Sequence, residues 1–346
     1  MTRIPADQLE TVVSALFQAA GLNSECATVC AENLVYANLR GIDGHGVVRV
    51  PHYLDRLQRG STRADAVPRF EHVAPTLGLL DANHGMGQVA GTAAMARAVP
   101  IAAEFGTAFV AVRNSGHFGA AGYYGQQAAR DGFATLIFAN TDQIVAPFGG
   151  RKTFFGSNPI ACIFPGPGEP VTIDLATSAI PYGKVVLAKT EGRSIPPDWG
   201  LDAEGHPTTD PAAVVALHHM AGPKGFALAM VIELLTSLIT GGPYGPDIPA
   251  MYGAEDQQRL LSHAFLVIHL ERFLPMSNYR ERVAEMVERL HAVPPAEGFK
   301  TVLAPGEPEQ QTRAERLANG IPLDTGTLEA LRKSGRELAV AVPFGS

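Results

Sequence analysis

Cysteine is scarce in this sequence, and positive charge is in the minority. The 346 residues include only three cysteines, Cys26, Cys30 and Cys162, an odd number that is too small for a disulfide framework. We therefore expect a reducing, cytoplasmic compartment. Lysine and arginine total 27 against 34 aspartates and glutamates, and the net charge of −7 argues against nucleic acid or an anionic membrane as the main partner.

Long apolar runs are also missing. A membrane span needs about 18 apolar residues, and the longest candidate, 226–240, contains Glu233 and ends at a glycine pair. The opening MTRIPADQLETVV lacks the basic and apolar segments of a signal peptide. Hydrophobic residues nevertheless make up 46% of the chain, which is enough for a large core in one or two domains. These features favour an enzyme or a small-molecule binder.

Hydrophobic spacing divides the chain into a helical beginning and a mixed middle. Helical spacing covers 6–21, 24–40, 88–99, 123–130, 226–239 and 278–291, and strand-like runs cover 77–80, 108–112, 134–139, 160–164, 171–173 and 266–268. The pattern predicts an α/β fold, with an α/β domain at 76–291 and helical parts at 1–75 and 292–346 that pack together. The segment 226–239 is apolar on nearly every side, so we expect a buried helix.

A glycine-rich turn at 85–90, GMGQVA, matches the dinucleotide-binding pattern G-x-G-x-x-A. It lies between a predicted strand and a predicted helix, and Glu104 is near the spacing of a ribose-binding acid. The later strands, however, are separated by loops, whereas a doubly wound fold alternates strands with helices. We therefore interpret the motif as a structural turn. The sequence also lacks a P-loop and a G-x-S-x-G motif.

Two histidine neighbourhoods indicate chemistry. His45 lies between glycines in RGIDGHGVVR, which lets a substrate approach closely, and Arg49 is suited to clamp a carboxylate. His117 lies in NSGHFGAAG, directly after a predicted strand, where α/β proteins form ligand sites. The alternatives are a solvated His45 in a capping turn and a His117 bonded to a carbonyl. Neither stretch contains HxxxH or HExxH, so we expect no zinc.

Two further loops have the composition of binding surfaces. Asp174 follows a predicted strand and precedes two hydroxyl residues, so it is a candidate to bind ribose hydroxyls; an Asx turn is the alternative. Lys224 lies just before the apolar helix, where a phosphate would meet the helix N-terminus; a solvated lysine is the alternative.

Taken in order, several stretches resemble the type-2 malate/lactate dehydrogenase family, whose members are NAD(P)-dependent oxidoreductases of 2-hydroxy acids and related imino acids. The resemblance covers nearly the whole chain. Within the family it is strongest to the ureidoglycolate dehydrogenases, through AGPKGFALAMVIELLTSLITGGPYG and SIPPDW. The other matching stretches are RGIDGHGVVRVPHY, DANHGMGQVAG, NSGHFGAAGYY, VAPFGGRKTFFGSNPIAC, IDLATSAIPYGKV and PGEPEQ.

The resemblance implies a fold and a set of site residues. It implies a non-Rossmann cofactor domain with a mixed sheet, a helical domain from the N- and C-terminal parts, and a homodimer. His117 matches the catalytic histidine, His45 a second active-site histidine, and Arg49 the residue that binds the substrate carboxylate. The matched cofactor positions are Thr141, Asp174, Leu175, Ala176, Lys224, Gly225, Gly306, Glu307 and Pro308.

The implied reaction is hydride transfer from a 2-hydroxy acid to a nicotinamide, with His117 as the base because imidazole titrates near neutral pH. The resemblance implies (S)-ureidoglycolate as substrate, oxalurate as product and NAD as cofactor, with NADP as the second choice. The sequence is also compatible with a malate, lactate or sulfolactate dehydrogenase, an NADPH-dependent imino-acid reductase, an inactive binding protein or a zinc hydrolase. Gly44 departs from the family, which usually has serine there, so a proton relay through that hydroxyl is missing.

Apolar residues in an irregular segment indicate a covered surface. Tyr244, Ile248, Met251 and Tyr252 follow the apolar helix in a Gly/Pro loop. Aromatic and methionine side chains are enriched in interface cores, and twofold pairing is the commonest way to cover them. We predict a homodimer with this loop at or near the contact and beside the active site. The alternative is that the loop folds over its own domain.

Overall fold

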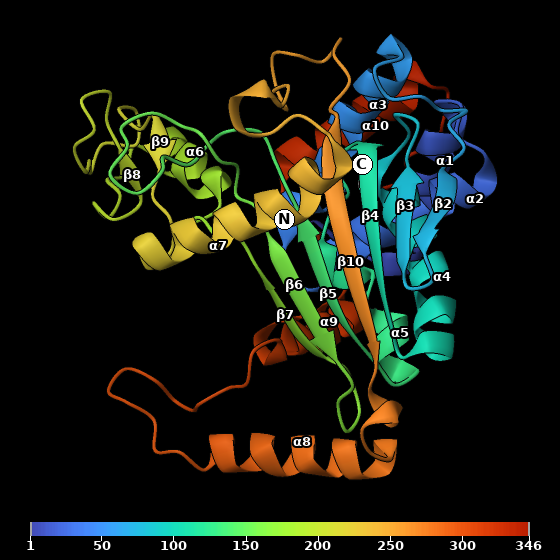
Figure 1. The fold of residues 1–346 in the computed structure, drawn as a ribbon. Coiled ribbons are helices and arrows are strands. Elements are labelled where there is room, and N and C mark those ends of the chain that lie inside the picture. Colours follow the sequence, from blue (N-terminus) through green and yellow to red (C-terminus); the bar gives the residue numbers. More distant parts are fainter. Residues whose placement is uncertain (1, 345–346) are drawn as a thin grey trace.

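The strand-like runs assemble into one mixed sheet. In the computed structural model, which describes residues 2–344, this sheet has seven strands in the order β2-β3-β4-β10-β5-β6-β7 (Figure 1). The β3–β4 pair is parallel and the other neighbouring pairs are antiparallel. This order confirms the predicted α/β class with a non-Rossmann mixed sheet, since a doubly wound sheet is mostly parallel. The strands are β2 (Arg69–Ala74), β3 (Leu77–Asp81), β4 (Thr107–Ser115), β5 (Phe133–Ala139), β6 (Ile160–Phe164), β7 (Val171–Leu175) and β10 (Leu261–His269).

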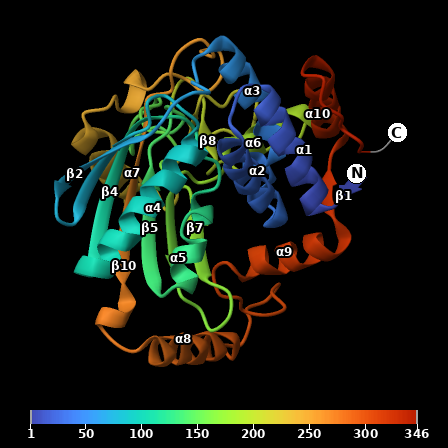
Figure 2. The same cartoon turned by 90° about the vertical axis from the view of Figure 1, so that its right-hand side faces the viewer.

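Helices cover both faces of this sheet, and two short strand pairs lie outside it. Figure 2 shows α4 and α5 on one face, and Figure 1 shows α7 crossing the other. The helices are α1 (Ala6–Ala19), α2 (Ser24–Leu39), α3 (Val50–Arg59), α4 (Gly87–Phe105), α5 (Gln126–Arg130), α6 (Tyr182–Thr190), α7 (Pro223–Glu233), α8 (Met276–His291), α9 (Glu307–Asn319) and α10 (Thr325–Glu337). The short pairs are β1 (Thr2–Ile4) with β11 (Ile321–Leu323), and β8 (Gly200–Leu201) with β9 (Ala216–Leu217).

Alternating side chains of the strands supply two apolar layers. In β5, Ile137 packs into the layer under α4, whereas its neighbour Phe138 packs on the opposite face with Ile232 of α7. This alternation follows from the two-residue period of a strand. The sheet is therefore buried between helices over much of its area.

A separate hydrophobic cluster joins the two ends of the chain. Phe17 of α1, Leu34 of α2 and Leu54 of α3 pack with Leu331 of α10 in this cluster. Figure 2 shows these helices grouped beside the sheet. The divisions at residues 75 and 291 stay a prediction, and β2, although it lies before residue 75, belongs to the main sheet.

The prediction of a buried helix at 226–239 is wrong. The helix α7 ends at Glu233 and continues as a π-helical segment, Leu234–Leu238. One side packs on the sheet, but Met230, Val231 and Ile239 are 46–54% exposed. A helix that is apolar on every side can still lie on one face of a sheet. Only the side that packs on the strands is then buried within the chain. The hydrophobic spacing also did not predict β2 or α6.

Within residues 2–344, no helix is both long and apolar enough to cross a membrane.

Candidate active site

The turn that carries His45 is built around one buried asparagine. Asn38, near the end of α2, donates from Nδ2 to Asp43 Oδ1 at 2.6 Å, and its Oδ1 accepts from the backbone N–H of Val47 at 2.8 Å. A Cβ at Gly46 would lie 2.2 Å from the same Oδ1, so this close approach requires glycine. The two hydrogen bonds fix the backbone on both sides of His45.

The turn that carries His117 follows β4 and has no room for larger residues. A Cβ at Gly87, the first residue of α4, would lie 2.4 Å from the carbonyl oxygen of Gly116. A Cβ at Gly119, where φ is 74°, would lie 1.8 Å from Asn33 Oδ1. The G-x-G turn therefore lets α4 support the backbone beside His117, which agrees with its interpretation as a structural turn.

Behind this turn lies His263 of β10, which is fully buried. Its Nε2 is 2.9 Å from Ser115 Oγ, and its ring stacks on Phe118 with centroids 4.2 Å apart and planes 3° from parallel. Burial lowers the pKa of His263 to about 3, so the ring stays neutral. His263 thus contacts residues on both sides of His117.

The two predicted histidines meet. The rings of His45 and His117 are stacked, with centroids 5.5 Å apart and planes 22° from parallel. Tyr53 Oη is 2.5 Å from His117 Nδ1, so Nδ1 is engaged and Nε2 is the nitrogen available to a substrate. Burial lowers the pKa of His45 to about 4, and burial and the neighbouring His45 hold the pKa of His117 well below its usual range. Both rings are therefore neutral at pH 7.

Arg49 lies beside these rings and is held from two sides. Its Nε donates to the carbonyl oxygen of Gly44 at 2.7 Å, and its Nη1 donates to Tyr252 Oη. The guanidinium carbon is 5.9 Å from the centre of the Tyr252 ring. Within residues 2–344, Nη2 has no hydrogen-bond partner, so this edge of the guanidinium remains for a substrate carboxylate.

Arg56, which sequence reasoning missed, shapes the irregular segment 249–259. This buried side chain donates from Nη1 to the carbonyl of Gln257 at 2.9 Å and from Nη2 to the carbonyls of Ala250, Met251 and Ala254 at 3.0–3.3 Å. One guanidinium therefore satisfies four backbone acceptors that no regular secondary structure would pair.

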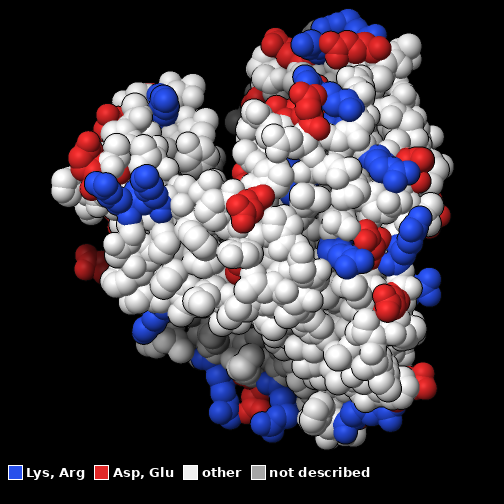
Figure 3. Space-filling model, turned by 45° about the horizontal axis from the view of Figure 1, so that its top comes forward, with Lys and Arg blue, Asp and Glu red and all other residues white. Residues whose placement is uncertain are grey.

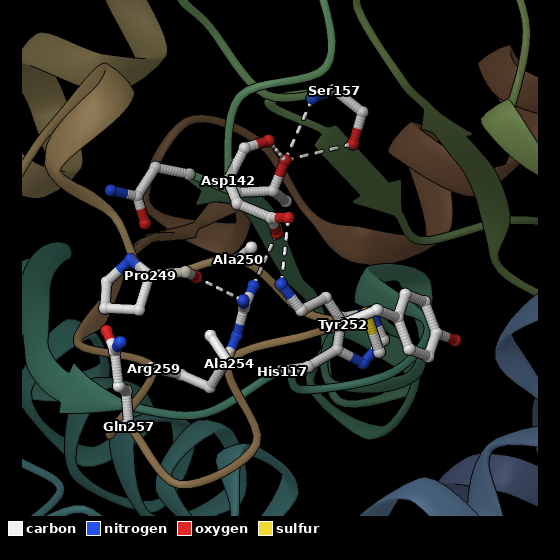
Figure 4. Close-up of polar contacts among 12 residues, drawn as sticks. His117, Asp142, Ser157, Pro249, Ala250, Tyr252, Ala254, Gln257 and Arg259 are labelled. Atoms are coloured by element: carbon white, nitrogen blue, oxygen red, sulfur yellow. Dashed lines mark hydrogen bonds and ion pairs between the residues drawn. The ribbon is translucent and has the colours of Figure 1, made fainter.

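Arg259 and Asp142 complete the wall on this side. Arg259 Nη2 is 2.5 Å from Asp142 Oδ1, and Asp142 Oδ2 accepts from the backbone N–H of Met251 at 3.0 Å (Figure 4). A small pocket opens beside His117, and its lining includes His52, Tyr53, Arg56 and Arg259. The site is therefore larger than the motifs predicted.

One sequence signal would have found part of this wall. His45 is followed by Arg49, His52, Tyr53 and Arg56, a three- and four-residue spacing that places polar side chains on one face of α3 and the turn before it. Asp142 and Arg259 have no comparable local signal, because their contact joins distant parts of the chain.

A chain of hydrogen bonds connects the three segments that carry Thr141, Ala176 and Lys224. Thr141 Oγ1 accepts from the N–H of Ser157 at 2.9 Å, and the carbonyl of Ser157 accepts from the N–H of Thr177 at 2.8 Å. The carbonyl of Thr177 in turn accepts from the N–H of Met220 at 2.9 Å, just before Lys224 and Gly225. The end of β5, the end of β7 and the beginning of α7 are thereby brought together.

The remaining cofactor candidates surround β7. Asp174, which Leu175 and Ala176 follow, accepts at Oδ2 from the N–H of Gly122 at 2.8 Å. Gly306 packs on the same strand, since a Cβ there would lie 2.5 Å from the carbonyl oxygen of Thr172. Glu307, which precedes Pro308, accepts at Oε2 from the N–H of Ala304 at 2.7 Å, so its carboxylate is engaged within its own turn.

Lys224 fits the phosphates of a dinucleotide. It is exposed at the start of α7, and its amine has no partner within residues 2–344. A helix N-terminus with an adjacent cation is a favourable place for a phosphate. The same described residues hold no group of three or more His, Cys, Asp or Glu side chains arranged to bind a metal ion.

Comparison with known proteins gives the family. The family model for malate/L-lactate dehydrogenases matches residues 4–332. The chain belongs to the malate/L-lactate dehydrogenase family. The predicted resemblance is thereby confirmed.

Relatives within the family differ in the substrate that they are named for. A ureidoglycolate dehydrogenase (NAD(+)) from Escherichia coli (strain K12) is 37% identical over 322 residues, which are 93% of this chain and 92% of that protein. A (2R)-3-sulfolactate dehydrogenase (NADP(+)) from Chromohalobacter salexigens is 35% identical over 94% of this chain and 96% of that one. The crystal structure of malate dehydrogenase from Entamoeba histolytica matches with a TM-score of 0.94 and 28% identity, covering 99% and 100% of the two chains.

These malate/L-lactate dehydrogenase relatives are dehydrogenases of hydroxy acids, and two of them are named with a nicotinamide cofactor. Family membership therefore supports hydroxy-acid dehydrogenation with a nicotinamide cofactor, and leaves the particular acid and the choice of NAD or NADP to the site itself.

Proposed function

We propose that this protein oxidises (S)-ureidoglycolate to oxalurate with NAD. One observation carries the reaction type: two neutral, stacked histidines beside Arg49, with Tyr53 hydrogen-bonded to His117 Nδ1. The choice of ureidoglycolate and NAD is supported by the 37% identity to a relative with that activity and cofactor in its name.

The proposed chemistry separates one hydride and one proton. Arg49 holds the carboxylate through its free Nη2 edge, and the substrate hydroxyl donates to His117 Nε2. As the C–H bond beside the hydroxyl breaks, Nε2 takes the hydroxyl proton and the carbon becomes a carbonyl. The nicotinamide, when bound, accepts the hydride. In the neutral ring that accepts this proton, Nδ1 carries the ring's own proton and donates to Tyr53 Oη, and this hydrogen bond persists when the ring becomes cationic.

His45 would act through its contact with His117. A neutral ring at 5.5 Å excludes water from one side of His117 and adds no charge that would oppose protonation. The choice of His117 as the base is supported by its hydrogen bond to Tyr53, because a base whose second nitrogen is held by an orienting group is the usual arrangement for proton transfer.

The cofactor would be held by the residues at the ends of β5 and β7 and at the start of α7. Lys224 at the start of α7 suits the pyrophosphate, and Asp174 is exposed to accept ribose hydroxyls. Thr141, Leu175, Ala176, Gly225, Gly306, Glu307 and Pro308 would complete this site. Comparison of kcat/KM with NAD and NADP tests the cofactor; a preference for NADP would contradict the proposal.

The reaction is tested by following absorbance at the NADH band with a panel of 2-hydroxy acids: ureidoglycolate, malate, sulfolactate and lactate. We expect the highest kcat/KM with (S)-ureidoglycolate. Arg49→Lys should raise KM for the acid by about tenfold while the Kd for NAD stays unchanged, because an ammonium does not replace a forked guanidinium. An unchanged KM would remove Arg49 from carboxylate binding.

We also propose a homodimer in the cytoplasm. An apolar band over α6, α7 and the segment after it has exposed side chains at Val186, Leu187, Met230, Leu234 and Ile239. Figure 3 shows this face, where charged side chains are sparse across the centre. Tyr244 is exposed as well, whereas Ile248 is buried, so the following loop folds partly over its own chain. Light scattering should give about twice the chain mass of 36.6 kDa; a monomer with full activity would contradict the dimer.

A further inference from the structure

The pocket beside His117 contains two arginines whose N–H groups already donate to other parts of the chain. Arg259 is paired with Asp142 at 2.5 Å. Arg56 donates to four backbone carbonyls and, from Nε, to His52 Nε2 at 3.1 Å. Within residues 2–344, the Nε of Arg259 also has no partner but is buried, so Arg49 is the guanidinium of the three that keeps an accessible free edge, which suffices for one carboxylate.

His52 presents a neutral donor in the same pocket. A guanidinium nitrogen only donates, so His52 Nε2 is the acceptor and the neutral ring carries its proton on Nδ1. Within residues 2–344, Nδ1 has no hydrogen-bond partner, and the half-buried ring lines the pocket and packs against Tyr252 at 4.9 Å. Burial, together with Arg56, Arg49 and Arg259, lowers the pKa of His52 to about 4, so it adds no positive charge at pH 7.

We propose that His52 is a specificity-determining residue that selects 2-hydroxy acids with a single negative charge and a second, neutral hydrogen-bond acceptor such as an amide or ureido carbonyl. This inference rests on the proposed function, since it concerns the same pocket. A second carboxylate would lose more hydration than a neutral carbonyl and would contact only the neutral Nδ1–H of His52, because Arg56 already donates to His52 and to four carbonyls; this disfavours malate-like dianions. A neutral carbonyl loses little hydration and gains the Nδ1–H donor.

Malate and its 4-amide form the matched pair that tests this proposal, because the two acids have nearly the same shape and differ in the second charge. For the wild-type protein with saturating NAD, kcat/KM for the amide should exceed that for malate by about 10- to 100-fold, the range expected for hydrogen bonds that involve charge. A malate value equal to or above the amide value would overturn the inference.

Two variants assign the discrimination to His52. His52→Arg places a cation in the pocket and should shift the amide-to-malate ratio toward malate by at least about tenfold. His52→Phe keeps a ring against Tyr252 but lacks the donor, and should lower the ratio of the amide to 2-hydroxybutyrate by about tenfold. His72→Arg, which adds the same charge on the exposed strand β2, is the control and should leave both ratios unchanged.

The outcomes separate this inference from the function on which it rests. 2-Hydroxybutyrate lacks a second polar group, so its oxidation by the wild-type protein measures hydride transfer alone. Absence of turnover with these three acids and with (S)-ureidoglycolate overturns the proposed function, and the inference falls with it. Turnover without discrimination, or ratios in His52→Arg and His52→Phe that match those of His72→Arg, overturns the inference alone. Thermal unfolding verifies that each variant is folded.

Discussion

The turn at 115–119 and the segment 249–259 lie on two sides of the same pocket and are held by different means. The turn is short, and glycines let the backbone pack against α4 and Asn33. The segment is longer and irregular, and its carbonyls bind a guanidinium from α3. The turn that carries the proposed base is thus positioned by close backbone packing, whereas the opposite wall of the pocket depends on a few charge-assisted hydrogen bonds. A single substitution therefore has different consequences in the two regions.

Removal of the base should have the largest effect. His117→Ala leaves the packing of both regions intact but removes the proton acceptor, so kcat should fall by about 10²- to 10⁴-fold. Steady-state kinetics measures the loss, and NAD binding by fluorescence should be unchanged. Retention of more than about a tenth of wild-type kcat would show that another group takes the proton.

Replacement of Arg56 should disrupt the segment 249–259 and leave the turn at 115–119 unchanged. Arg56→Lys loses several of the contacts to the carbonyls of Gln257, Ala250 and Met251, so kcat/KM should fall by about 10- to 100-fold, mainly through KM. Arg63→Lys is the control, because Arg63 is 42% exposed and pairs with Asp65 at the surface, outside the segment 249–259. Equal effects of the two substitutions would refute the role given to Arg56.

The pH dependence of stability tests the neutral histidines around the site. In the folded protein the pKa is about 4 for His45 and His52 and about 3 for His263. The unfolded chain takes up protons as the pH falls through about 6.5, but the folded protein does not. The free energy of unfolding should therefore be flat above about pH 7 and fall below pH 6.5 by about 1.4 kcal/mol per pH unit for each such histidine.

Urea unfolding between pH 5 and pH 8 measures this slope. His263→Phe, behind the catalytic turn, removes one of the contributing groups and should make the slope shallower by one proton. A stability that stays level down to pH 5 would show that these rings are protonated in the folded state.

The smallest effect is expected at Gly44. A Cβ there meets no atom within 4 Å, so Gly44→Ser restores the usual family residue without a clash. Stability should change by no more than about 0.5 kcal/mol and kcat by about twofold or less. A much larger gain in kcat would show that the missing hydroxyl limits proton transfer, and that Tyr53 and His117 alone do not explain the chemistry.

Much of the fold follows from local pattern. The short apolar run at 160–164 predicted β6 at its observed residues, and the apolar spacing of α2 with its end at Gly41 located that helix within one residue. Both signals lie within a few turns or residues of the element that they predict. The exposure of α7 does not follow from a local signal. It depends on how much of the helix packs on the sheet and on what covers its outer side.

The site divides in the same way. His45 and His117 lie in glycine-rich turns that the sequence shows directly, although their stacking does not follow from either turn alone. No sequence signal marks Asp142 or Arg259, since an aspartate in a loop and an arginine before a strand are both common. The ion pair between them forms only when the chain folds. Long-range ion pairs are therefore the part of the site that local reasoning misses.

The fate of deuterium from C2 of the substrate distinguishes hydride transfer from every other route to a reduced cofactor. The wild-type protein is mixed with NAD and 2-deuterated (S)-ureidoglycolate in ordinary water, and the reduced cofactor is examined by mass spectrometry. Direct hydride transfer, with the hydroxyl proton passing to His117, predicts that deuterium appears in NADH and that the reaction is slower than with the protonated acid. Reduction of NAD without deuterium in the product, or no reduction at all, would contradict this chemistry.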